Sequence, residues 1–429
     1  MAATMSLHDQ AEQALALMKA AGFDAARAEA SRLSGTELNL AHNEPSLLRS
    51  TTVDKLALAG IVDGRMAATE LSDLSDDAVR SAVSALFADA RTAPQDDANA
   101  LTAGQHADLL QGPQEADEAR LADKVAELLH FRETETPAMM LEEGFVSHQR
   151  LESKLLSSGG SDIGCRLGWY RVTAFGTARI GQRVSSFNYA EGTTNDLRAA
   201  PAQGFGGIEP MLRDTVRQVD AQPIASKFVG DIVLTPPAVA SLLGWLQGQL
   251  SDMHLIAGSS LYRERLGQAV AAPLLSLKSR FDAPGVAAIS ADGHVAPPVE
   301  LLRDGVLMNL TPSLYGSRKT GLRQVPIAGA GWDVPAGTTP LAELLAGVRH
   351  GALVGRLSMG NPAPNGDFSG VIKNSFLVEG GTVGPALREV MVSGNIARML
   401  LDVLAVSRER IDTGGWNLPW LRIGGMHFS

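Results

Sequence analysis

The sequence predicts an α+β chain: an N-terminal domain of helices and sheet, followed by a mostly antiparallel β domain with packed helices. Of its 429 residues, 45% are hydrophobic and 20% are charged, which is typical of a globular protein. Helical and strand-like patterns alternate in the first half, whereas strand pairs that turn on glycine dominate the second. At about 150 residues per domain, two or three domains are expected. We place the main boundary so that the first domain spans residues 1–221 and the second spans residues 222–429.

The first predicted domain opens with a helix. Residues 7–21 carry apolar side chains at helical spacing, and Gly22 follows as a stop signal. The chain is then strand-like to about residue 71, and Asp63-Gly64 predicts a hairpin turn within this stretch. The remaining predictions for this domain are, in chain order, a helix at 75–90, a polar linker at 91–115, a helix at 115–130, antiparallel strands within 145–190 and a helix near 209–219.

The second predicted domain begins with a strand at 230–234, and Pro236-Pro237 then starts a helix that runs to about residue 250. Proline is tolerated there because the first turn of a helix has no intrahelical partner for its N–H groups. The remaining predictions are strand pairs at 299–308 and 375–383, a helix from Pro340 to Gly351, a strand at 352–357 and a final helix at 395–406.

Composition and termini exclude several classes of protein. The single cysteine, Cys165, rules out an internal disulfide and a cysteine-only zinc site within one chain. A net charge of -10 is a poor match to a phosphate backbone, so we expect no nucleic-acid partner. The N-terminus lacks the basic and apolar regions of a secretory signal, and no stretch of about 18 apolar residues predicts a membrane span. We therefore expect a cytoplasmic protein.

The short motifs of well-known enzyme classes are absent from the sequence. There is no P-loop, no G-x-G-x-x-G, no G-x-S-x-G and no H-E-x-x-H. Two polar segments remain as candidates. Residues 361–370 form a turn-rich loop that is either part of a binding cleft or a plain surface loop. Asn395 is either part of the same site or the N-cap of the last helix.

Six segments of the second half, in this order and spacing over 225–429, resemble the TldD/PmbA family, also called TldD/TldE. They are Gly258–Gln268, Leu302–Leu307, Tyr315–Leu322, Leu341–Leu353, Asn365–Gly370 and Val392–Asn395. The first half is similar more loosely, through its order of helix, strands and helix. The resemblance implies a second domain that is barrel-like.

The family contains two kinds of subunit, which differ in a zinc motif. The TldD kind carries H-E-x-x-x-H on a helix and a cysteine near the C-terminus, whereas the TldE/PmbA kind lacks them. The matching helix positions here are Leu243, Gly244 and Gly248, and residues 413–420 contain no cysteine. Leucine and glycine offer zinc no lone pair and leave no general base. The resemblance therefore implies a TldE/PmbA-type subunit with no catalytic residue and no metal of its own.

This resemblance also implies a partner and a substrate. It predicts a heterodimer with a TldD-like subunit that holds the zinc, and a metallopeptidase complex that processes unfolded peptides or ribosomal peptide precursors. This chain would close and shape the chamber. The candidates for binding peptide there are Asn361, Asp367, Ser369 and Asn395.

Two other functions stay open at this point. The chain could be a stand-alone enzyme that tailors peptides without metal, in which case dispersed residues such as Cys165, His148 and Asp162 would have to converge. It could instead be a peptide-binding or regulatory protein, since the family's older name refers to modulation of DNA gyrase. The sequence alone does not separate general peptide turnover from the maturation of one natural product.

Overall fold

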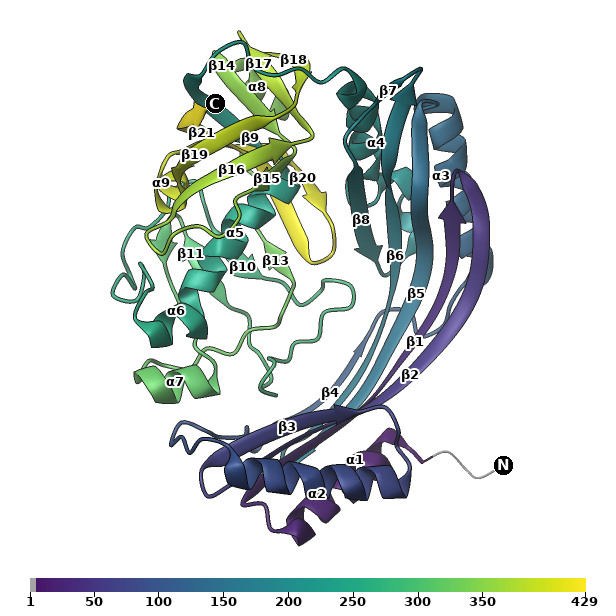
Figure 1. Ribbon diagram of the computed structural model, residues 1–429, viewed down its shortest axis with the longest axis vertical. Coiled ribbons are helices and arrows are strands. Elements are labelled where there is room, and N and C mark those ends of the chain that lie inside the picture. Colours follow the sequence, from purple (N-terminus) through teal and green to yellow (C-terminus); the bar gives the residue numbers. More distant parts are fainter. Residues whose placement is uncertain (1–4) are drawn as a thin grey trace.

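The structure, a computed structural model, describes residues 5–429 and contains two β-sheets (Figure 1). Residues 1–4 lie outside the described residues. They belong to the predicted N-terminal domain and to the segment in which no secretory signal is expected. The first sheet has the strand order β3-β2-β1-β5-β6-β4, with β7 and β8 also paired to β6. Its strands are β1 (Ala25–Ala41), β2 (Glu44–Val62), β3 (Arg65–Leu71), β4 (His106–Gln111), β5 (Met139–Ser157), β6 (Asp162–Ile180), β7 (Arg183–Val184) and β8 (Asn188–Thr194).

Helices cover one face of this first sheet. They are α1 (Leu7–Ala21), α2 (Asp76–Thr92), α3 (Glu118–Glu135) and α4 (Ile208–Arg217). Alternation along β1 explains the packing: Ala26, Ala28 and Ala30 are buried in one core with α1 and α2. Further along the same face, α3 and α4 pack on Val146 and Val172 in a second core. The long strands curve, and the second half of the chain lies on their concave side (Figure 1).

The second sheet branches around the C-terminal strand, β21 (Trp416–Phe428). This strand pairs with β9 (Phe228–Leu234), β13 (Trp332–Asp333), β19 (Val390–Asn395) and β20 (Val403–Asp412). The other strands are β10 (Leu277–Ser279), β11 (Glu300–Arg303), β12 (Val306–Leu307), β14 (His350–Val354), β15 (Arg356–Ser358), β16 (Asp367–Lys373), β17 (Ser375–Glu379) and β18 (Thr382–Leu387). The predicted fold class, α+β with a mostly antiparallel second domain, is confirmed.

The second sheet packs against α5 (Pro236–Leu250), whose leucines lie in the largest hydrophobic core. The remaining helices are α6 (Asp252–Ala257), α7 (Leu314–Thr320), α8 (Leu341–Ala346) and α9 (Ile396–Leu401), with single 3-10 turns at Leu197–Ala199, Ala202–Gly204 and Gln218–Asp220. None of the helices in residues 5–429 is long and apolar enough to cross a membrane.

In three predicted elements, a strand occupies residues that the sequence pattern assigns to a linker or a helix. The linker at 91–115 contains β4, which pairs in parallel with β6. The helix predicted to run to Gly351 ends at Ala346, and the following residues form β14 between β9 and β17. The helix predicted over 395–406 ends at Leu401, and Val403 begins β20. In each case pairing with a distant strand outweighs the local pattern.

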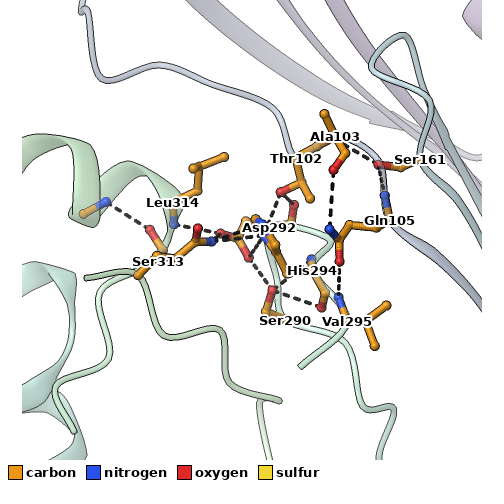
Figure 2. A network of polar contacts seen from close by, with 12 residues as sticks. Thr102, Ala103, Gln105, Ser161, Ser290, Asp292, His294, Val295, Ser313 and Leu314 are labelled. Atoms are coloured by element: carbon orange, nitrogen blue, oxygen red, sulfur yellow. Dashed lines mark hydrogen bonds and ion pairs between the residues drawn. The ribbon is translucent and has the colours of Figure 1, made fainter. Parts of the chain in front are cut away.

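Polar contacts join the two halves of the chain around a loop at 95–105. Thr102 Oγ1 donates to the carbonyl oxygen of Asp292 over 2.6 Å and lies 3.0 Å from His294 Nδ1. Figure 2 shows this network between the loop and the hairpin that carries Ser290, Asp292 and His294. The loop and this hairpin therefore form one of the contacts between the two halves.

Asp96 forms a second contact between the two halves, and we expect this contact to be sensitive to acid. Its carboxylate lies 2.8 Å from Lys319 Nζ and accepts hydrogen bonds from Ala98 N and Tyr315 Oη. The bonds from Lys319, Ala98 and Tyr315 lower the pKa of Asp96 from 3.8 to about 2. A carboxyl group whose pKa is lower in the folded chain than in the unfolded chain stabilises the fold at pH values above its unfolded pKa. This contribution is lost as the pH falls from about 4 to about 2.

We therefore expect the free energy of unfolding of Asp96→Asn to decrease less than that of the unmodified chain between about pH 4 and about pH 2. Urea unfolding midpoints measured across this range would show the difference. Asp97→Asn is the matched control, because the Asp97 carboxylate makes no hydrogen bond or ion pair with residues 5–429. An Asp96→Asn variant with the same acid dependence as Asp97→Asn would contradict the assignment.

Candidate functional site

Helix α5 presents a buried face and an open face, and the three positions that match the family zinc motif are divided between them. Leu243 is 0% exposed and lies in the main core with Leu242 and Leu246. Gly244 and Gly248 lie one turn apart, and a Cβ atom added at either would have no neighbour within 4 Å. None of the three positions therefore offers a ligand atom, and the side chain of Leu243 points into the core.

A resident zinc ion does not fit the residues that are present. Among residues 5–429, no three His, Cys, Asp or Glu side chains are grouped so that they could hold a metal ion. The C-terminal segment that carries a cysteine in the TldD kind is a glycine turn here. Its Gly414 has φ +88°, and a Cβ atom there would lie 1.6 Å from Thr193 Oγ1 of β8. This turn is packed tightly against the first sheet and carries no thiolate.

The structure brings together two of the four residues predicted to bind peptide. Asn395 Nδ2 donates to Asp367 Oδ1 over 2.8 Å, and the two residues are directly paired across β16 and β19. Ser369 lies two residues along β16 on the same exposed face, opposite Ser393. Asn361 is exposed in the preceding loop and makes no side-chain hydrogen bond to the described residues.

The Asp367 carboxylate is held in its ionised form. Hydrogen bonds from Asn395 and from Asn365 lower its pKa below the usual value. A carboxylate stabilised in this way is a weak general base, but it can accept hydrogen bonds from a ligand. Asn395 also caps α9, because its Oδ1 accepts from Arg398 N over 3.0 Å. The alternative reading of Asn395 as an N-cap is therefore confirmed, and its side chain bonds to Asp367 as well.

The concave face of the first sheet carries a polar row that sequence reasoning missed. Strand register aligns five residues from five strands, Arg49, Glu37, Ser147, Arg171 and Thr193. Residues directly opposite in a sheet point to the same side. This side faces the second half of the chain, because the turn at Gly414 packs on Thr193. Glu37 and Ser147 are polar residues within strands, but only the register shows that they meet.

Part of this row is buried without satisfied hydrogen bonds. The hydroxyl of Ser147, which is 1% exposed, has no partner among the described residues, and neither has Arg171 Nε. Arg49 and Glu37 form an exposed ion pair at 2.6 Å at the other end of the row. Buried polar groups without partners are rare in folded proteins, and they are usually satisfied by water or a ligand. The concave face is therefore a candidate binding surface.

Comparison with known proteins places the second half of the chain in a family. The model of the PmbA/TldA metallopeptidase C-terminal domain matches residues 228–429. "Metalloprotease PmbA homolog" from Haemophilus influenzae is 23% identical over 439 aligned positions, which cover 92% of this chain and 91% of that protein. Residues 228–429 belong to the TldD/PmbA family. "Metalloprotease PmbA" from Escherichia coli O157:H7 is also 23% identical, but the matched 213 residues span only 45% of each protein.

Solved structures share the fold of the whole chain. TldE from Thermococcus kodakarensis has a TM-score of 0.81 at 17% identity and covers 97% of this chain and 99% of its own. A Bacteroides thetaiotaomicron protein described as a proposed DNA gyrase modulator has a TM-score of 0.84 at 21% identity, and the match covers 98% of each chain. At these identities the similarity establishes the fold.

The dispersed residues that a metal-independent enzyme would need do not converge in this chain. Burial raises the pKa of the Cys165 thiol to about 11, so it stays protonated at neutral pH. Burial lowers the pKa of His148, whose Nε2 lies 2.8 Å from the carbonyl oxygen of Pro113. On β5, His148 lies five residues from Ser153, the partner of Cys165, a separation of about 16 Å along the strand. Asp162 instead pairs with Lys154.

Proposed function

We propose that this chain is the zinc-free, TldE/PmbA-type subunit of a heterodimeric metallopeptidase that processes unfolded peptides or ribosomal peptide precursors. One observation carries the proposal: α5 has Leu243 in the core where the TldD kind has its first histidine, and glycine at the two open positions where that kind has a glutamate and a second histidine. The relatives named metalloproteases support a peptidase role for a complex that includes such a chain.

In this proposal, residues 1–221 supply a wall of the chamber and residues 222–429 supply the surface around α5. The wall is the concave face, where the accessible end of the row, with Arg49 and Glu37, offers a donor and an acceptor to a peptide. Asn361, Asp367, Ser369 and Asn395 remain the proposed peptide-binding residues of the second half. The zinc belongs to the TldD-like partner, so this chain contributes binding and enclosure.

The free edge of β2 supports binding of an extended peptide. Within the described chain, β3 pairs only with residues 56–62 of β2, so the edge from Glu44 to Lys55 is unpaired. Leu47, Leu48 and Val53 are about half exposed along this stretch. An edge of this kind can accept an added strand through backbone hydrogen bonds, with little dependence on sequence.

Affinity purification of the tagged full-length chain from its native host tests the partnership. We expect one co-purifying protein at a near one-to-one ratio, carrying H-E-x-x-x-H, and identified by mass spectrometry. The pair should cleave an unfolded peptide in a chelator-sensitive reaction, and neither chain alone should do so. Recovery of the chain alone, with peptidase activity of its own, would contradict the proposal and favour a stand-alone enzyme.

A further inference from the structure

A cavity of about 560 Å³ lies between the concave face of the first sheet and loops of the second half. It lies away from the polar row already described, near the end of the sheet that carries β3, where α7 is the nearest helix of the second half (Figure 1). Its lining includes Arg27, Met66, Leu101, Asp292, Tyr315 and Ile327. Cavities of this size at domain junctions, with apolar walls and a few polar groups, are typical of small-molecule sites.

Arg27 is the cationic group of this cavity. Its neighbours Ala26 and Ala28 are buried beneath α1 and α2, so alternation along β1 turns Arg27 to the concave face. One guanidinium nitrogen lies 3.5 Å from the position that a Cβ atom would occupy at Gly293. The guanidinium makes no hydrogen bond or ion pair with residues 5–429, although it is only partly exposed. A fork of N–H donors without a partner is suited to a carboxylate.

Asp292 lines the same cavity, but its carboxylate is already occupied. Oδ1 accepts from the Ser290 hydroxyl, and Oδ2 accepts from Leu314 N over 2.8 Å and from Gln324 Nε2 over 3.4 Å. Figure 2 shows Asp292 at the centre of this network. Asp292 therefore positions the hairpin beside Arg27, and its oxygens are occupied by neutral donors, whereas the N–H donors of Arg27 have no partner among residues 5–429.

The rest of the lining selects for an apolar body. Met66, Leu101, Val325, Pro326 and Ile327 come from three separate segments and surround the space beside Arg27. We propose that this cavity binds a carboxylate that carries a branched aliphatic or aromatic group, with Arg27 as the anchor for the carboxylate. A free organic acid and the C-terminus of a short peptide share this chemistry. The site is distinct from the proposed function and does not depend on a partner.

Isothermal titration calorimetry on the full-length chain tests the site with 4-methylpentanoate, its amide, and acetate. We expect the acid to bind at least about 10-fold more tightly than the amide, because a charged hydrogen-bonded pair is lost with the amide. Acetate should also bind at least about 10-fold more weakly, because it has no apolar body to bury. An acetylated tripeptide ending in leucine, compared with 4-methylpentanoate, distinguishes a peptide C-terminus from a small acid.

Two variants make the test specific to the cavity. Arg27→Gln should weaken binding of the acid by about 10-fold or more, whereas Arg91→Gln, on the exposed end of α2, should leave it unchanged. Ala291→Trp should block the cavity at an exposed lining position. The proposal is overturned if 4-methylpentanoate does not bind, if acid and amide bind equally, or if Arg27→Gln binds the acid as the unmodified chain does. These results would leave the metallopeptidase proposal unaffected.

Discussion

Replacing Leu243 with histidine should lower the free energy of unfolding by about 3 to 5 kcal/mol. Leu243 is fully buried in the core of the second half, so the imidazole would lose apolar contacts and its nitrogens would lose water. This position matches the first histidine of the family zinc motif, so the variant tests whether the motif could simply be restored on this helix. Urea unfolding monitored by circular dichroism gives the difference.

Gly248→His is the matched control, since the same residue is introduced at the last position of the same motif. A side chain there enters open space, so we expect a change within about 1 kcal/mol. If Leu243→His were as stable as Gly248→His, Leu243 would not face the core in solution. The division of the motif between a buried and an open face would then be wrong.

Gly168→Ala should also be strongly destabilising, by about 3 kcal/mol or more. A Cβ atom at Gly168 would lie 1.6 Å from the carbonyl oxygen of Pro113, so the crossing segment or β6 must shift. The same carbonyl is 2.8 Å from His148 Nε2, so the shift would also disturb a buried polar contact. Because Trp169 follows directly and packs over Gly285 of the second half, the change should loosen the junction of the two halves.

Thermal unfolding of Gly168→Ala beside Gly329→Ala measures this effect. Gly329 is exposed, and a Cβ atom there would meet nothing within 4 Å, so the control should unfold close to the unmodified chain. Equal melting temperatures for the two variants would show that the 112–114 segment does not cross β6 as closely as described.

Elements fixed by local chemistry could be predicted from the sequence. Gly22 adopts the left-handed conformation with φ 95° and its N–H caps α1, as its place after a helical pattern predicts. Asp63 and Gly64 both have positive φ and join β2 to β3, which is the turn that the Asp-Gly pair favours. Asn395 likewise caps α9 through a bond to a residue three positions away.

Features that depend on distant pairing could not be predicted in this way. Val403 and the residues after it have helical spacing of apolar side chains, yet they pair with β21 and form a strand. The polar row of the concave face needs the register of five strands before its members meet. The cavity beside Arg27 needs the packing of both halves, because its lining comes from segments more than half the chain apart. No local pattern carries that information.

The metal content of the purified chain shows whether it is a zinc-free subunit. The full-length protein, purified in the presence of zinc and dialysed, would be measured by inductively coupled plasma mass spectrometry against protein concentration. We expect far less than one zinc per chain, because Leu243, Gly244 and Gly248 supply no ligand. About one zinc per chain, removed by a chelator together with peptidase activity, would show that this chain is itself the metallopeptidase.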